Sequence, residues 1–142
     1  GSMGVAAMVV ILLVKFAAIV ALLQSSADNS ALLLSGLVLV PMMARAGIIG
    51  LMATTAYVRK EGMVSTTQSA ASLRKLLVMA AVLALLAVLL LQGQAGWILA
   101  VWVGVLALYR RALKKRLGGY TGDTLGAAVE IQEAVLLVAL VL

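Results

Sequence analysis

The chain has 142 residues, of which 65% are hydrophobic and 11% are charged, and its formal net charge is +6. A soluble domain is typically about half apolar and about a quarter charged, so this composition excludes an ordinary soluble domain and indicates a membrane protein. The chain contains no cysteine and no histidine. This excludes disulfides, thiolate chemistry, the usual zinc sites and histidine acid–base catalysis within the chain, and any metal must be held by oxygen ligands, which favours magnesium or calcium.

Five apolar runs predict an all-α bundle of about five membrane-spanning helices, forming a single transmembrane domain over residues 1–142. In chain order the runs are 5–23, 31–58, 76–91, 97–109 and 127–142. A spanning helix needs about 20 residues. The second run is therefore long enough to tilt or to kink at Pro41, whereas the fourth run is short.

The cations lie between the apolar runs in a pattern that predicts topology. Segments 59–75 and 110–126 carry all the Lys and Arg residues of the connections, whereas 24–30 and 92–96 carry none. The positive-inside rule makes 59–75 and 110–126 cytoplasmic loops and 92–96 a tight outer turn. Because the charges follow the membrane pattern, we expect the lipid bilayer as a partner and no nucleic acid.

The strongest local signal is the segment 117–127, Leu-Gly-Gly-Tyr-Thr-Gly-Asp-Thr-Leu-Gly-Ala. Its glycines allow a backbone to approach a ligand closely, and the apolar helix that follows presents free N–H groups. Asp123 can bind a hard cation, and the preceding cations can pair with phosphates. These features suit a phosphate–magnesium site at the membrane surface. The alternative is a flexible turn with Asp or Thr as helix N-cap, in which the cations serve topology only.

Four charged residues lie inside the apolar runs. Glu130 and Glu133 are three residues apart and share a helix face. Acids in a span usually face the bundle interior or a cavity; a shallow interfacial position is the alternative, and it is favoured for Glu133. Lys15 and Arg45 lie near the middles of the first two runs. Either ion pairs with the two glutamates or an anionic ligand in a cavity would satisfy these cations.

The segment 117–128, together with Glu130 and Glu133, resembles the C-terminal signature of the cobalamin synthase family, the adenosylcobinamide-GDP ribazoletransferases. The segment Tyr57-Val58-Arg59-Lys60-Glu61-Gly62-Met63 is similar to a Tyr-Ala-Arg-x-Glu-Gly-Leu-like turn of that family. Arg45 and the first apolar run, with Gly1–Gly4, are similar as well. The resemblance therefore covers essentially the whole chain, and it favours a native origin for residues 1–3 over a tag remnant.

The resemblance implies a multi-pass enzyme of the bacterial inner membrane, with its glycine-rich segment on the cytoplasmic side. Such an enzyme joins adenosylcobinamide-GDP to α-ribazole or its 5′-phosphate, gives adenosylcobalamin or its phosphate and GMP, and uses Mg²⁺. Catalytic roles are implied for Asp123 and Glu130, with Asp123 also a metal ligand. Contacts to substrate or phosphate are implied for Gly118, Gly119, Thr121, Gly122, Gly126, Lys115, Arg116, Arg45, Arg59 and Glu61.

One departure from the family pattern limits this expectation. The family carries an aspartate-rich motif, roughly Asp-Gly-x-x-Asp-x-x-Asp-Gly, and residues 1–142 contain nothing of the kind. We therefore expect the chain to be the C-terminal part of a longer protein and to be inactive alone. Two alternatives are a small-anion transporter fragment and a non-catalytic membrane scaffold, and the sequence leaves open whether the protein forms homo-oligomers.

Overall fold

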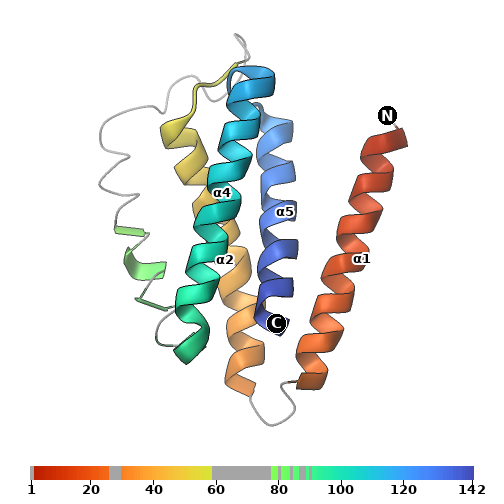
Figure 1. The fold of residues 1–142 in the computed structure, drawn as a ribbon, viewed down its shortest axis with the longest axis vertical. Coiled ribbons are helices and arrows are strands. Elements are labelled where there is room, and N and C mark those ends of the chain that lie inside the picture. Colours follow the sequence, from red (N-terminus) through yellow and green to blue (C-terminus); the bar gives the residue numbers. More distant parts are fainter. Residues whose placement is uncertain are drawn as a thin grey trace.

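A computed structural model shows an all-helical, multi-pass membrane protein. It describes residues 2–25, 30–58, 78–79, 81–83, 85–86, 89 and 91–142. The named helices are α1 (Ser2–Ser25), α2 (Ser30–Thr54), the short 3₁₀ helix η1 (Gln92–Gln94), α4 (Ala95–Leu117) and α5 (Gly122–Val141), as Figure 1 shows. Within the described part, 4 helices are long and apolar enough to cross a membrane.

The first, second and fifth apolar runs form α1, α2 and α5, as the sequence predicted. Helix α2 continues through Pro41, and α5 begins at Gly122, five residues before the predicted run. Nine of the sixteen positions of the third run, 76–91, are among the described residues, and every one of these nine is helical.

The fourth helix is longer than predicted. The prediction ended it at Tyr109, where the apolar run meets the first cations, but α4 continues to Leu117 and carries Lys114, Lys115 and Arg116 in its last turn. Lys and Arg are good helix formers, and cations at a helix C-terminus interact favourably with its dipole. The predicted loop 110–126 is therefore mostly helical, and only 118–121 connect α4 to α5. The membrane side of this connection stays a prediction.

Helix α5 is the centre of the bundle, because α1, α2 and α4 all pack against it. Helices α1, α2 and α5 pack closely where they meet near the C-terminus of α5. A Cβ atom on Gly36 would lie 2.7 Å from Leu22 Cδ2 and 3.2 Å from Leu140 Cδ1, and both leucines are buried. A glycine in α2 thus lets the three helices approach closely at this end.

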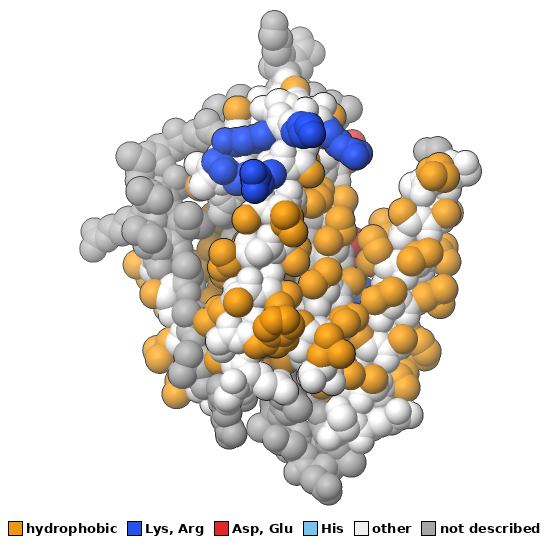
Figure 2. All heavy atoms as spheres, in the orientation of Figure 1, with side chains coloured by type: hydrophobic (Ala, Val, Ile, Leu, Met, Phe, Trp, Pro, Cys, Tyr) orange, Lys and Arg blue, Asp and Glu red, His pale blue; other side chains and the backbone are white. Residues whose placement is uncertain are grey.

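Helices α1 and α5 run in the same direction and diverge toward their N-termini (Figure 1). The space-filling view shows a notch between the N-terminal half of α1 and the rest of this face (Figure 2). Many apolar side chains of this half of α1 are exposed, including Val5, Val10 and Leu13. The notch opens at the same end of the bundle as the glycine-rich connection.

Candidate functional site

The glycine-rich connection is fixed to the end of α2. Gly118 adopts φ 74° and ends α4 in a left-handed C-cap, a conformation that glycine adopts without strain. The Tyr120 N–H donates to the Ala56 carbonyl at 2.9 Å, and the Val58 N–H donates to the Tyr120 carbonyl at 3.1 Å. A Cβ atom on Gly119 would collide with that same Ala56 carbonyl. Gly118 and Gly119 therefore have structural reasons to be glycine.

Tyr120 makes both of these backbone hydrogen bonds, and its side chain is buried, with 1% of the residue's surface exposed. Its ring centroid lies 5.3 Å from that of Tyr57. Burial raises the pKa of the Tyr120 hydroxyl above its ordinary value, and the interaction with Tyr57 raises it further. Tyr120 therefore packs between the connection and the segment that follows α2.

Thr121 is the N-cap of α5. Its hydroxyl accepts a hydrogen bond from the Thr124 N–H, and the Thr124 hydroxyl accepts one from the Thr121 N–H at 2.8 Å, so the two residues form a reciprocal capping box. The Tyr109 hydroxyl of α4 donates to the Thr124 carbonyl at 2.7 Å. Of the alternative interpretation of this segment, the threonine N-cap is confirmed, whereas the roles of the neighbouring cations stay predictions. The Tyr109 contact holds the start of α5 in place against α4.

Asp123 lies in the first turn of α5 and is exposed. Gly122 and Gly126 lie beside it, and a Cβ atom on either would meet nothing within 4 Å. Asp123, Gly126 and Glu130 follow one another at helical spacings of three and four residues, so they line one face of α5. This face is exposed near the N-terminus of α5, from Asp123 to Gly126. It is therefore the accessible part of the glycine-rich segment.

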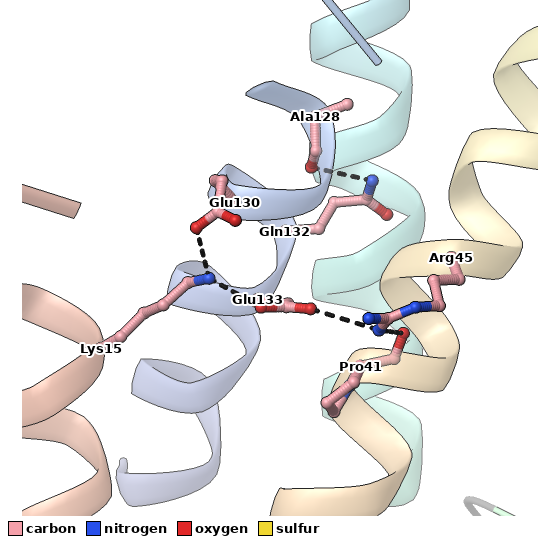
Figure 3. A network of polar contacts seen from close by, with 7 residues as sticks. All are labelled: Lys15, Pro41, Arg45, Ala128, Glu130, Gln132 and Glu133. Atoms are coloured by element: carbon pink, nitrogen blue, oxygen red, sulfur yellow. Dashed lines mark hydrogen bonds and ion pairs between the residues drawn. The ribbon is translucent and has the colours of Figure 1, made fainter. Parts of the chain in front are cut away.

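A charged network joins three helices at mid-depth (Figure 3). Lys15 Nζ of α1 lies 2.6 Å from Glu130 Oε2 and 2.6 Å from Glu133 Oε2 of α5. Arg45 Nη1 of α2 lies 3.5 Å from Glu133 Oε1 and donates to the Pro41 carbonyl at 3.0 Å. Two cations and two carboxylates balance one another, so the ion-pair interpretation, one of the two given for these cations, is confirmed. Acids and bases inside spans usually pair in this way.

The shallow position favoured for Glu133 is wrong. Glu133 is the twelfth residue of the 20-residue helix α5 and bridges Lys15 and Arg45. It also borders a small cavity of about 130 Å³ between α1, α2 and α5, next to Lys15, Gly36 and Pro41. The spacing of Glu130 and Glu133 gave their shared face, but their depth depends on where α5 begins, which the sequence placed too late.

A second buried polar contact was missed in the sequence. Gln132 is 2% exposed, donates to the Ala128 carbonyl at 3.0 Å and accepts from Trp102 Nε1 at 3.0 Å. Gly47 of α2 makes room for it, because a Cβ atom there would collide with the Gln132 amide oxygen. The sequence signal that could have indicated this contact was a glutamine within one apolar run and a tryptophan within another. Trp102 thus packs, whereas Trp97 is exposed.

The cations of α4 gather at one end of the molecule, above the apolar surface of the bundle (Figure 2). Arg110 Nη2 donates to the Thr54 carbonyl at 3.0 Å and Arg110 Nε to the same oxygen at 3.3 Å, so this residue caps the C-terminus of α2. Arg111, Lys114, Lys115 and Arg116 are exposed.

The structure brings only some of the expected site residues together. Asp123, Gly122 and Gly126 share the open start of α5, and Arg116 lies two residues before the connection. Glu130 and Arg45 belong to the mid-depth network instead. Arg59 and Glu61 lie outside the described residues. The described part of the chain contains no group of three acidic side chains that could hold a metal ion.

Comparison with known proteins places these features in a family. Residues 1–141 match the family profile described as CobS, cobalamin-5-phosphate synthase. The chain is 39% identical over 146 residues to the adenosylcobinamide-GDP ribazoletransferase of Stutzerimonas stutzeri, which covers 100% of this chain and 55% of the relative. It is 40% identical over 147 residues to the Pseudomonas entomophila protein of the same name, covering 100% of this chain and 56% of the relative.

The chain thus spans about half the length of the curated relatives it matches, which are bacterial. No solved structure matches it with significant similarity.

Proposed function

Because the chain belongs to the cobalamin-5-phosphate synthase family, we propose that the whole protein is an adenosylcobinamide-GDP ribazoletransferase of the bacterial inner membrane. In this reaction a hydroxyl of α-ribazole, or of its 5′-phosphate, attacks the phosphorus on the corrinoid side of the diphosphate. The bond from that phosphorus to the bridging oxygen breaks, GMP leaves and the hydroxyl proton is released. The glycine-rich connection faces the cytoplasm in this proposal.

The observation that carries the proposal for this half of the protein is the exposed Asp123 at the open start of α5. The α5 N-terminus adds a positive dipole end, and Gly122 and Gly126 leave the backbone accessible to a ligand. A diphosphate ester carries the negative charge that such a helix end attracts. Gly118, Gly119 and Thr121 support this arrangement by holding the connection in shape.

Two cations flank the proposed site in different ways. Arg116 lies in the last turn of α4, just before the connection, and we assign it to charge compensation on the leaving GMP. Lys115 follows the buried Leu113 by two residues, so it projects roughly 200° away from the side of α4 that packs in the bundle. Lys115 therefore acts on a bound substrate only through its long-range electrostatic field, without direct contact.

Arg59 and Glu61 complete the same surface in our proposal. Val58, the last described residue before them, is hydrogen-bonded to Tyr120, one residue before the α5 N-cap. The chain therefore reaches residue 58 beside the start of α5. A second segment with a cation and an acid at this place suits the binding of a diphosphate and its counter-ion.

Glu130 and Arg45 act as positioning residues in this scheme. Glu130 lies seven residues after Asp123, roughly 10 Å along the helix, and its carboxylate is bonded to Lys15. Arg45 lies at the other end of the same network. Together they set the place of α1 and α2 against α5, the helix that presents Asp123.

A magnesium ion is the cofactor that the family and the reaction favour. Its chemistry would be to neutralise charge on the diphosphate. Asp123 has the oxygen ligand that Mg²⁺ prefers, but the described residues offer no group of acids around it. This part of the chain therefore supplies one ligand, and the roles given above belong to its own side chains.

The test is GMP release by the full-length protein in lipid, supplied with adenosylcobinamide-GDP, α-ribazole 5′-phosphate and Mg²⁺. Asp123→Asn should lower kcat by roughly 100-fold, in the range seen when one electrostatic contact to a reacting group is lost. Its unfolding temperature should not change, because Asp123 is exposed. The matched control is Asp28→Asn, which removes the other aspartate of the chain from a segment predicted to lie on the opposite side.

The outcomes separate the enzyme from the role of Asp123. Well-folded protein that releases no GMP, or releases it without α-ribazole phosphate, overturns the transferase proposal and favours the transporter or scaffold alternative. Release that is equally fast in Asp123→Asn and Asp28→Asn keeps the transferase but removes Asp123 from its site.

A further inference from the structure

Helix α4 has distinct inner and outer faces at its C-terminal end. Tyr109 and Leu113 mark the inner face: the Tyr109 hydroxyl bonds to α5, and Leu113 is buried. Arg111 and Lys115 each follow one of these residues by two positions, so they lie on the opposite face. Lys114 lies between the two faces, and all three cations are exposed. We call Arg111, Lys114 and Lys115 the outer cations.

The outer cations have no acidic partner among the described residues. Every ion pair of the described part belongs to the mid-depth network of Lys15, Arg45, Glu130 and Glu133. Arg110 and Arg116 differ from the outer cations, because Arg110 bonds to the Thr54 carbonyl and Arg116 adjoins the connection to α5. Arg111 and Lys115 thus face away from the bundle, and Lys114 lies exposed at the side of the same helix.

The depth of the outer cations follows from the length of α4. Trp97 lies at the other end of the helix and is exposed, as is common for tryptophan at a membrane interface. Lys115 follows it by 18 residues, a rise of roughly 27 Å, close to the hydrocarbon thickness of about 30 Å. With Trp97 at one interface, Lys114 and Lys115 reach the headgroup layer of the other, and Arg111 can extend its side chain to it.

We propose that the outer cations Arg111, Lys114 and Lys115 form a binding surface for the headgroups of anionic phospholipids such as phosphatidylglycerol. The position and exposure of the outer cations, and their lack of an acidic partner within the part of the chain that the structure describes, match a phosphate-bearing surface that surrounds the protein, not a soluble ligand that enters it. Of the three outer cations, only Lys115 also bears on the proposed transferase site, and it does so through its long-range field without contact, so phospholipid binding does not depend on that activity.

The test is native mass spectrometry of the full-length protein, released from detergent and titrated with phosphatidylglycerol or phosphatidylcholine of the same acyl chains. Each basic residue near an anionic membrane contributes about fivefold in binding. The unaltered protein should therefore prefer phosphatidylglycerol by at least about tenfold, and the variant Arg111→Gln/Lys114→Gln/Lys115→Gln should lose this preference. If that variant does not fold, Arg111→Gln and Lys115→Gln should each reduce the preference separately.

Two matched variants and one competitor decide the interpretation. Arg111→Lys/Lys114→Arg/Lys115→Arg should keep the preference, because it keeps the charges. Lys60→Gln/Arg74→Gln/Lys75→Gln removes the same charge from the segment 59–75 and should keep most of it. The proposal is overturned if the outer-cation variant retains the preference, if both neutralising variants lose it equally, or if millimolar inorganic phosphate abolishes it, which would indicate a site for free phosphate.

Discussion

Gly119 is a residue at which a single methyl group should disturb the connection between α4 and α5. A Cβ atom there would collide with the Ala56 carbonyl and lie 2.7 Å from Val58 Cγ2. We predict that Gly119→Ala breaks the backbone bridge to Tyr120 and lowers stability by about 1–3 kcal/mol, the usual cost of overpacking. Thermal unfolding of the full-length protein in one detergent measures this.

Gly126→Ala is the control, because a Cβ atom on Gly126 meets nothing within 4 Å and the residue lies inside α5. Alanine is favoured over glycine in a helix by about 1 kcal/mol, so this variant should unfold at the same temperature or higher. If a ligand approaches the open face of α5, the same variant should release GMP more slowly. Equal unfolding temperatures for Gly119→Ala and the unaltered protein would contradict the first prediction.

Gln132 and Trp102 should behave as a coupled pair. Gln132→Leu leaves the Trp102 Nε1–H without its acceptor in a buried place, which costs about 1–3 kcal/mol. Adding Trp102→Phe removes that donor, so the double variant should be less destabilised than the sum of the two single variants. A double-mutant cycle of unfolding measurements tests this; strictly additive losses would mean that the bond contributes nothing.

Sequence patterns predicted some of these residue-scale features and not others. The charges of Lys15, Arg45, Glu130 and Glu133 suggested their network, because unpaired charges in spans are costly. The contact of Gly119 with Ala56 joins residues far apart in the chain, and no local pattern encodes it. The roles of Asp123, Arg59 and Glu61 stay predictions.

At the scale of helices, Lys15 is the link that holds α1 to α5 at mid-depth. Lys15→Met should deprive Glu130 and Glu133 of the cation that both contact at 2.6 Å, and we expect a loss of about 1.5–3 kcal/mol, typical of hydrogen bonds to charged groups. Lys15→Arg should restore most of it. Glu130→Gln/Glu133→Gln, added to Lys15→Met, should also recover stability, because neutral amides need no cation. Unfolding temperatures that are the same for Lys15→Met and the unaltered protein would contradict this role.

The extent of each helix was predicted less well than its existence. Apolar runs gave α1, α2 and α5 because lipid demands about 20 apolar residues per span. Helix α4 passes the end of its apolar run by eight residues, from Tyr109 to Leu117, because backbone hydrogen bonds continue where the side chains change from apolar to basic. The α5 start was placed late for a related reason: Gly122–Gly126 reads as a turn in sequence, whereas a capping box begins the helix there.

At the scale of the whole molecule, the membrane orientation can be tested directly. The chain contains no cysteine, so single cysteines can be introduced at exposed positions of opposite ends, Gly93→Cys before α4 and Ala112→Cys near its C-terminus. In a full-length protein without other cysteines, a membrane-impermeant maleimide should label Gly93→Cys in intact spheroplasts and label Ala112→Cys only after permeabilisation. The reverse pattern would place the glycine-rich connection outside and contradict a cytoplasmic site.

The class of the molecule was predictable from its sequence because a spanning helix satisfies its own backbone. The packing arrangement of the helices was less predictable, because helix faces that are apolar all round carry little periodic signal about which helix they contact. The central place of α5 depends on the packing of α1, α2 and α4 against it, including the close approach at Gly36, Leu22 and Leu140.

The divergence of α1 from α5 has a consequence for how α1 could tilt about Lys15. The C-terminal end of α1 is held where Leu22 packs against Gly36, and the middle of the helix is held at Lys15. The thirteen residues from Ser2 to Val14 extend roughly 20 Å beyond Lys15. A tilt of about 10° around Lys15 would sweep the start of α1 by roughly 3 Å while the packing at the far end hardly moved. A change in the ion pairs of Lys15 with Glu130 and Glu133 would therefore change the width of the notch beside the start of α5.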